Sequence, residues 1–391
     1  MVTPTPAPAR QADVLVVGAG VLGTFHAYFA ALKGYKTLLV ERNAFPSDAS
    51  TRNFGMIAQS IVPVGGVWSG YARDSAEVYR ALQGAHDIGA RAPGSLYVAS
   101  TELERRVLDE FARLYGPDYD CAYLDADEAR YRYPFIQVSY CMGALLFPDD
   151  LTLEPRRMLR QLIPYLTRRG LLDYAPHTTI VSVESSGQGC LARDARGNSY
   201  AADRAIVCGG ADCTTLFPTL LERSGLRLCK LRMMRTVAQG GYTLPHALLS
   251  GLSIRRYPAF ASCPSYAPLL DEPVDATLRD YGIHLLFKQL PDGSIVVGDS
   301  HQYVDVRDAA LLAESTNPAI DAAVLGYGRR MLAPPSWDIQ ERWNGYYLTH
   351  PAREVYAETI DGVIHLVTGI GGKGMTTGPG YARAYIDAVL P

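Results

Sequence analysis

The sequence of 391 residues lacks any Cys-x-x-Cys pair, and its seven cysteines are odd in number. We therefore expect no metal site and no disulfide framework, and a reducing, cytoplasmic location. An excess of one charge is also lacking, because 37 basic residues and 40 acidic residues leave a formal net charge of −3. This balance favours neither nucleic acid nor an anionic membrane as partner, and leaves a small molecule as the expected ligand.

A long uninterrupted hydrophobic run is missing as well. The most apolar stretch, residues 14–32, is interrupted by glycines and by His26, and no basic start typical of a signal peptide precedes it. We expect a buried strand followed by a buried helix here, and no membrane span. Residues 1–10, which are rich in proline, are expected to form a flexible leader, with order beginning near Asp13.

Two strand patterns are present. Continuous apolar strands, typical of a parallel sheet covered on both faces, occur at residues 13–17, 36–40, 205–208 and 364–368. An alternating strand at 94–100 and a pair at 282–289 and 293–300, joined by a turn at 291–293, indicate antiparallel pairing.

These patterns predict an α/β protein with a Rossmann-like domain and a discontinuous second domain of α+β type, built on an antiparallel sheet. We assign residues 11–80, 150–225 and 345–391 to the first domain. Residues 81–149 and 226–344 form the expected substrate-binding domain.

The first candidate site is a glycine loop between a strand and a helix. Gly18 permits a tight turn, Gly20 the approach of a pyrophosphate, and Gly23 close packing of the helix, which Gly34 ends. Glycines also mark plain turns, but Glu41 lies about 20 residues further on, where an acidic side chain accepts hydrogen bonds from a ribose. An acid at this place argues against a 2′-phosphate, and both FAD and NAD fit the unit.

A second glycine loop, residues 369–374, follows the strand at 364–368 and precedes an expected final helix at 380–389. The start of a helix carries partial positive charge, which suits the flavin edge that becomes negative on reduction, and Lys373 adds a full charge. A plain C-terminal turn is the alternative. Two such units in one chain favour FAD, which is long enough to reach both.

Several segments resemble the D-amino acid oxidase superfamily of FAD-dependent amine oxidoreductases, which includes glycine oxidase and sarcosine oxidase. Besides the glycine loops, these are residues 50–55, 153–156, 179–181 and 207–211. The resemblance implies FAD contacts at Gly18, Ala19, Gly20, Val21, Leu22, Gly23, Glu41, Arg42, Ser50, Thr51, Arg52, Asn53, Ile180, Cys208, Gly209, Gly210, Gly369, Gly371, Gly372, Lys373, Gly374, Met375 and Thr376.

One feature departs from the family. Its members carry an arginine before the last strand that pairs with the substrate carboxylate, and Tyr347 stands at that place here. Residues 52–55 and 368–376 are most similar to a bacterial subgroup associated with aminophosphonate breakdown. The resemblance thus implies a small amine with an anionic group as substrate.

A phosphonate is tetrahedral and is bound better by several converging hydrogen-bond donors than by the planar guanidinium of one arginine. Basic candidates are Arg232, Arg235, Arg255, Arg256, His284, Lys288, His350 and Arg353. We single out Arg52, His284 and Lys288 as substrate contacts, because they lie on a flavin loop or on a strand expected to face the flavin. Tyr257, Tyr346 and Tyr347 are expected to shape the site.

The implied reaction is oxidation of a primary or secondary amine by hydride transfer to flavin N5, followed by imine hydrolysis to an aldehyde and reoxidation by oxygen. Oxidation of glycine, sarcosine or a D-amino acid is one alternative. A dehydrogenase that reduces a quinone or a protein acceptor is another, and a flavin-binding protein without turnover is a third.

Overall fold

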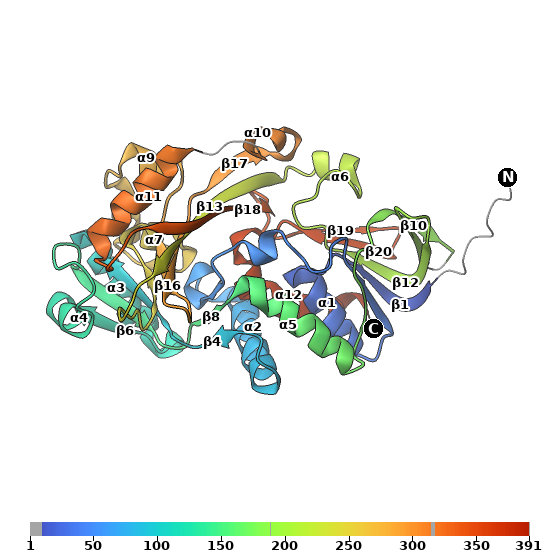
Figure 1. The fold of residues 1–391 in the computed structure, drawn as a ribbon, viewed down its shortest axis with the longest axis horizontal. Helices are drawn as coiled ribbons and strands as arrows, with labels where there is room; N and C mark the ends of the chain where they lie inside the picture. Colours follow the sequence, from blue (N-terminus) through green and yellow to red (C-terminus); the bar gives the residue numbers. More distant parts are fainter. Residues whose placement is uncertain (1–9, 188, 314–316, 391) are drawn as a thin grey trace.

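The computed structural model describes residues 10–187, 189–313 and 317–390. It shows an elongated molecule with a large sheet toward each end of its long axis (Figure 1). The expected leader lies outside the described residues except for Arg10, which begins strand β1 (Arg10–Val17). Within the described residues, β1 thus begins three residues before Asp13.

The first sheet contains five parallel strands. In spatial order these are β9 (Asp173–Ala175), β2 (Thr37–Val40), β1, β12 (Ser199–Val207) and β20 (Ile364–Thr368). Strands β10 (Ile180–Ser186), β11 (Gly189–Asp194) and β19 (Tyr356–Ile360) extend it with antiparallel pairing. The four apolar strands predicted from the sequence are thus confirmed as neighbours in a parallel sheet.

Both faces of β1 are buried, which explains its uninterrupted apolar sequence. Successive side chains of a strand point to opposite faces. Val14 and Val16 pack in a core with α1 (Val21–Leu32), α2 (Gly66–Ala85), α5 (Pro155–Arg168) and α12 (Gly374–Val389). Leu15 and Val17 pack in a separate core on the other face.

The second sheet has nine strands and is antiparallel apart from one neighbouring pair. Its order is β17 (Gln302–Asp305), β13 (Arg227–Ala238), β16 (Ser294–Gly298), β15 (Leu286–Gln289), β14 (Ala247–Leu249), β5 (Ser95–Ala99), β7 (Gly143–Phe147) and β6 (Ala122–Asp125). Strand β18 (Ile339–Thr349) pairs with β13 along most of its length. The predicted antiparallel hairpin is confirmed as β15 and β16, whereas β14 and β5 run parallel.

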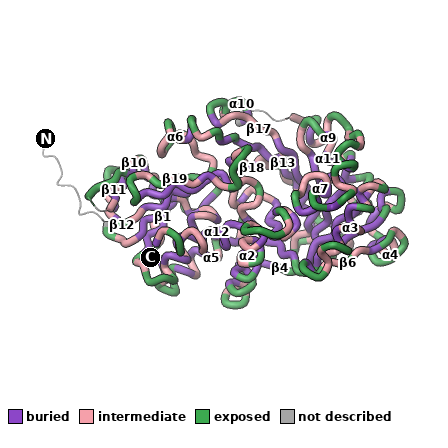
Figure 2. The backbone as a smooth tube through the Cα atoms, turned by 180° about the vertical axis from the view of Figure 1, so that it is seen from behind, coloured by how far each residue is buried: buried purple, intermediate pink, exposed green. Residues whose placement is uncertain are grey.

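The remaining strands form a small sheet of β3 (Met56–Ile57), β8 (Leu151–Leu153) and β4 (Ala90–Arg91). Buried residues follow the strands of both large sheets, and exposed residues gather on peripheral helices and loops (Figure 2). The predicted fold class, a Rossmann-like α/β unit combined with an antiparallel sheet, is confirmed. None of the described helices has the length and apolar character to cross a membrane.

The final helix corrects one expectation. It begins at Gly374 rather than Gly380, and includes Pro379. A proline inside a helix removes one intrahelical hydrogen bond, and here the following N–H, that of Gly380, bonds to Ser75 Oγ of α2 at 2.9 Å. The second glycine loop therefore runs through a short 3-10 turn, Gly371–Lys373, directly into α12.

Candidate flavin and substrate site

A first cavity of about 120 Å³ lies at the carboxyl ends of the parallel strands. Val17 ends β1, Val40 ends β2 and Cys208 follows β12, and all three line it together with Ile180 from β10. Ligands of open parallel sheets bind at this edge.

The first glycine loop forms one wall of this cavity. Gly18 has φ +93°, and a Cβ there would lie 2.4 Å from the carbonyl oxygen of Cys208. A Cβ on Gly23 would lie 1.8 Å from the carbonyl oxygen of Gly18, so strand and helix meet backbone to backbone. The N–H of Val21, at the start of α1, bonds to Ser50 Oγ at 2.9 Å. This helix start could hold a pyrophosphate against its remaining N–H groups.

Glu41 follows β2 and is only 6% exposed. Its Oε2 accepts the N–H of Ala19 at 3.0 Å, and its Oε1 accepts the N–H of Asn43 at 3.1 Å. The carboxylate thus fixes the loop, and its remaining lone pairs could accept bonds from ribose hydroxyls.

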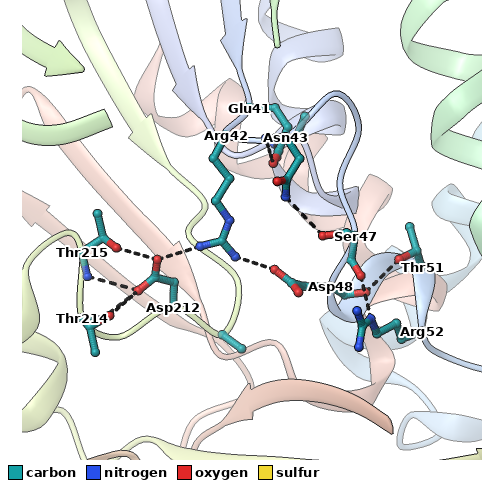
Figure 3. A network of polar contacts seen from close by, with 12 residues as sticks. Glu41, Arg42, Asn43, Ser47, Asp48, Thr51, Arg52, Asp212, Thr214 and Thr215 are labelled. Carbon is teal, nitrogen blue, oxygen red and sulfur yellow. Dashed lines mark hydrogen bonds and ion pairs between the residues drawn. The ribbon is translucent and has the colours of Figure 1, made fainter. Parts of the chain in front are cut away.

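Arg42 closes the rim of the first cavity (Figure 3). Its guanidinium donates to Asp212 at 2.9 Å and to Asp48 at 2.5 Å, and Asp212 in turn accepts from the hydroxyls of Thr214 and Thr215. Because two carboxylates already hold this cation, it is poorly placed to bind a 2′-phosphate. The geometry therefore suits FAD.

A second cavity of about 440 Å³ adjoins the first and shares Gly20, Ala49, Ser50, Cys208 and Gly210 with it. It passes the start of α1 and the loop 369–375, and ends among residues of the second sheet. Together the two cavities provide the elongated space that a dinucleotide with two aromatic ends requires. Their residues could hold the adenosine in the first cavity and the flavin in the second.

The second glycine loop contributes the backbone of Gly371–Met375 to the second cavity. The start of α12 thus supplies partial positive charge to its wall. Lys373 differs from the expectation of a free charge, because its ammonium lies 2.8 Å from Glu354 Oε2 and over the ring of Trp68. Burial lowers the pKa of Lys373, and Glu354 opposes that shift.

The predicted substrate contacts divide into two groups. Tyr257, His284 and Tyr347 line the second cavity, whereas Arg52, Lys288 and Tyr346 line neither cavity. Arg52 instead donates to the carbonyl oxygens of Ser47 at 2.7 Å and of Asn344 at 3.3 Å, and so links a flavin-side loop to β18.

Lys288 is a structural cation in this fold. It is buried, and Nζ donates to the carbonyl oxygens of Phe54 at 2.5 Å and of Leu153 at 2.6 Å. Burial lowers the pKa of this lysine to about 7. Two of its N–H groups are thus held by backbone, and Lys288 lines neither cavity.

Three predicted FAD contacts besides Arg52 also lie outside both linings: Ala19, Thr51 and Thr376. Ala19 bonds to Glu41, and the Thr376 hydroxyl bonds to the backbone of Met56 and Ala58, each at 3.3 Å. These residues support the loops. Every other residue of that predicted set lines at least one of the two cavities.

The structure adds residues that we did not single out. Arg256, Asp299, His301 and Tyr303 line the second cavity beside Tyr347. Arg256 bonds to the Tyr303 hydroxyl at 3.0 Å, and among the described residues no carboxylate forms an ion pair with it.

Other basic candidates near Arg256 in sequence are neutralised by acids. Arg232 pairs with Asp321 at 2.7 Å, and Arg255 pairs with Glu104 at 3.2 Å. Partners so distant along the chain give no sequence signal, so Arg256 did not stand out.

Asp299 and His301 could have been found from strand register. The N–H of His284 bonds to the carbonyl oxygen of Asp299 at 3.2 Å, and the N–H of Asp299 returns to His284 at 3.0 Å. His284 thus faces Asp299 across the ends of the predicted hairpin. Its Nε2 lies 3.1 Å from Asp299 Oδ1, and His301 Nε2 lies 3.8 Å from Oδ2.

Burial controls the charges of this cluster. It lowers the pKa of His284 and of His301 well below the usual range, and Arg256 lowers both further. Burial raises the pKa of Asp299, with His301 and Arg256 opposing the shift. Both imidazoles are therefore uncharged at neutral pH.

Comparison with known proteins identifies the family. The model of the family described as FAD dependent oxidoreductase (DAO) matches residues 13–388. The chain belongs to this family. FAD is thus the cofactor of this chain, and the residues of the two adjoining cavities could hold it.

Among curated relatives of this FAD-dependent oxidoreductase is the glycine oxidase of Bacillus licheniformis, 27% identical over 215 residues. That match covers 53% of this chain and 56% of the relative. The glycine oxidase of Geobacillus kaustophilus is 26% identical over 51% of this chain and 54% of its own. The matches thus span about half of each relative.

Solved structures share the fold over nearly the whole chain. Glycine oxidase from Geobacillus kaustophilus superposes with a TM-score of 0.76 at 16% identity, covering 97% of this chain and 95% of that chain. L-α-glycerophosphate oxidase from Mycoplasma pneumoniae, solved with FAD bound, gives a TM-score of 0.75 at 15% identity, covering 97% and 95%.

Proposed function

We propose that this FAD-dependent oxidoreductase oxidises a small amine that carries an anionic group, with an aminophosphonate such as 2-aminoethylphosphonate or its N-methyl derivative as the favoured substrate. The observation that carries the proposal is Arg256, a cation in the cavity wall that forms no ion pair within 4 Å with a described carboxylate and interacts with Asp299 only at longer range. A partly buried cation of this kind is stabilised further by an anionic ligand.

The groups around Arg256 suit a tetrahedral anion. Arg256 ends α7 (Gly251–Arg256), Tyr303 lies on β17 and Tyr347 lies on β18, so their polar atoms come from three elements. A planar carboxylate is matched by one bidentate guanidinium, whereas phosphonate oxygens point in several directions. The tyrosine at the family's usual arginine position supports this preference.

When bound, FAD accepts the hydride from the carbon that carries the amine. The chain orients that carbon and keeps the site dry. Apolar side chains of Met56, Ile61 and Leu286 line the cavity, and the ring of Tyr257 packs edge-on against His284 at 5.3 Å between centroids. A dry wall favours the uncharged amine, which is the form that can lose a hydride.

Oxidation of glycine or another small α-amino acid is a second candidate. The curated relatives that support it are both glycine oxidases, although each match covers only about half of the relative. A carboxylate would then occupy the place beside Arg256.

The test is a screen for hydrogen peroxide with 2-aminoethylphosphonate, its N-methyl derivative, glycine, sarcosine and D-alanine. We expect the highest kcat/KM with a phosphonate and reoxidation of the reduced flavin by oxygen at least as fast as turnover. Turnover of amino acids without any phosphonate would overturn the substrate assignment. Slow reoxidation in air would instead indicate a dehydrogenase, and absence of bleaching by every amine a non-catalytic flavoprotein.

A further inference from the structure

The cluster of His284, Asp299 and His301 is buried in the wall of the second cavity, with exposed fractions of 4%, 7% and 6%. Each offers one ligand atom, and the three atoms lie within 4.8 Å of one another. The three residues come together through the register of the hairpin, which pairs His284 with Asp299, and through the turn that follows it.

The hydrogen bonds of the two histidines leave their Nε2 atoms facing the carboxylate as acceptors. His301 Nδ1 lies 3.1 Å from the carbonyl oxygen of Gly282 and must carry the proton there. The Ser253 hydroxyl lies 3.3 Å from the carbonyl oxygen of Leu285 and 3.2 Å from His284 Nδ1. When it donates to Leu285, His284 Nδ1 donates to Ser253, and the Nε2 atoms of both rings are left with a lone pair toward Asp299.

Asp299 Oδ1 has no hydrogen-bond donor in the part of the chain that the structure describes, although His284 Nε2 is near. With the rings in these tautomers, three acceptor atoms face one another in a buried place. A cation or a shared proton between them stabilises such an arrangement.

We propose that His284, Asp299 and His301 bind a divalent transition-metal ion such as Zn²⁺ at the substrate end of the second cavity. Two imidazoles and one carboxylate are a common ligand set for Zn²⁺ with one position left open. Tetrahedral Zn²⁺ holds nitrogen and oxygen at about 2.0–2.2 Å, which puts neighbouring ligand atoms about 3.3–3.5 Å apart. In the structure His284 Nε2 lies 3.1 Å from Asp299 Oδ1 and His301 Nε2 lies 3.8 Å from Oδ2, and one ligand atom of each residue lies within 4.8 Å of the others. Small side-chain rotations would bring the three atoms to the spacing that Zn²⁺ requires.

The surroundings of the two imidazoles match those of metal ligands. A ligating histidine usually donates its other N–H to a carbonyl or a carboxylate, which fixes the ring. Here the carbonyl oxygen of Gly282 is the partner of His301 Nδ1. The hydroxyl of Ser253, which also contacts the carbonyl of Leu285, is the partner of His284 Nδ1. The backbone bonds between His284 and Asp299 hold two ligands at fixed separation.

The open position faces the cavity, and an anionic oxygen of the substrate is its ligand. This role rests on the proposed function, whereas metal binding itself does not. The charges also balance in this arrangement. The divalent ion and Arg256 carry three positive charges, and Asp299 and a phosphonate carry up to three negative charges. A metal ion and Arg256 would then hold the anion from two sides.

The test is titration of Zn²⁺ into FAD-loaded protein that carries no histidine tag and has been treated with a chelator. We expect one saturable site per chain in calorimetry, and a tetrahedral Co²⁺ absorption spectrum when Co²⁺ replaces Zn²⁺. His301→Gln and Asp299→Asn should weaken Zn²⁺ binding at least 100-fold. Ser253→Ala should weaken it about 10-fold, as expected for an outer-shell partner.

The matched control is His177→Asn, which removes an exposed histidine at φ +55°, a conformation that asparagine tolerates. It should bind Zn²⁺ as the wild type does. FAD absorbance and melting temperature verify that each variant folds. A wild-type protein without a saturable Zn²⁺ site, or with a site that His301→Gln and Asp299→Asn leave intact, overturns the inference.

The two proposals fail separately in these experiments. Amine oxidation by a protein that binds no Zn²⁺ would overturn the metal site and leave the proposed function standing. One equivalent of Zn²⁺ in a protein that oxidises no amine would do the reverse.

Discussion

At the scale of single residues, the buried Lys288 and the partly buried Arg256 have different roles. Lys288 gives its N–H groups to two backbone carbonyls, whereas Arg256 bonds to one tyrosine hydroxyl and faces the cavity. A cation held by backbone carbonyls fixes structure, whereas one with unused donors in a cavity is suited to bind a ligand. The contrast supports the proposal that Arg256 binds the substrate.

Arg256→Met should therefore raise KM for an anionic amine much more than it lowers kcat. Loss of a buried charge-assisted contact costs about 3 kcal/mol, which is about 100-fold in kcat/KM. Steady-state kinetics and FAD absorbance measure both effects. Arg307→Met, which removes an exposed cation paired with Asp305, is the control and should leave KM unchanged. Equal losses for an anionic and a neutral amine would contradict the assignment.

Lys288 predicts a pH dependence of stability. Its pKa is lowered to about 7 in the folded protein, against about 10.4 in an unfolded chain. Between these values the unfolded chain holds a proton that the folded protein has released, so stability rises with pH, by at most about 1.4 kcal/mol per pH unit.

The measurement compares wild type with Lys288→Met in denaturant unfolding from pH 6 to pH 9.5. The advantage of the wild type should be nearly constant below pH 7 and grow above it, since the neutral amine still has two N–H groups for its two carbonyls. Parallel curves across this range would show that Lys288 titrates alike in both states.

Half of the substrate contacts that were predicted from the sequence line the second cavity. Tyr257, His284 and Tyr347 follow from position near the flavin loops or on the expected strand. Arg52 and Lys288 bond to backbone carbonyls instead, because neither a loop position nor a strand position says whether a long side chain reaches ligand or backbone. That outcome depends on carbonyls brought close by remote parts of the chain.

At the scale of elements, the contact of β1 with α1 sets the pyrophosphate site. Gly23→Ala would place a methyl group into the carbonyl of Gly18, and the loop would have to shift. We expect a loss of about 1–3 kcal/mol in stability and at least 10-fold weaker FAD binding. Flavin fluorescence on mixing apoprotein with FAD measures the affinity, and thermal melting the stability.

Gly84→Ala in α2 is the matched control, because nothing lies within 4 Å of a Cβ there. It should keep FAD affinity and add up to about 1 kcal/mol of stability, since alanine favours helix over glycine. If both substitutions weaken FAD binding equally, the close approach of Gly23 to the carbonyl of Gly18 is not required for the site.

Elements with strong local signals were predicted well. The turn at 291–293 indicated the hairpin of β15 and β16, and glycine at 34 marked the end of α1. The start of α12 was missed, because glycines and Pro379 discourage a helix in isolation and only packing against α1 and α2 stabilises it. The parallel pairing of β14 with β5 is equally non-local.

At the scale of the whole molecule, the two adjoining cavities span both sheets. The first lies at the carboxyl edge of the parallel sheet, and the second reaches residues of β15, β17 and β18. A ligand that fills both therefore stabilises the arrangement of the sheets as well as each cavity. The domain boundaries assigned from the sequence stay a prediction, and partial unfolding of apoprotein is the natural test of them.

FAD should therefore stabilise the apoprotein more than either of its halves. A ligand that binds only the folded state adds about 2.7 kcal/mol at 100 times its Kd. ADP can fill only the first cavity and FMN only the second, so each should raise the melting temperature less than FAD at equal concentration. Joining the halves adds their contacts while the entropy of association is lost once.

The matched variant is Glu41→Gln, which changes the first cavity alone. Relative to its own unliganded melting temperature, it should reduce the shifts with ADP and with FAD and leave the FMN shift unchanged. An ADP shift as large as that of FAD would mean that the second cavity contributes nothing to cofactor binding. The flavin would then lie elsewhere, and the proposal that the substrate is oxidised in the cavity beside Arg256 would be wrong.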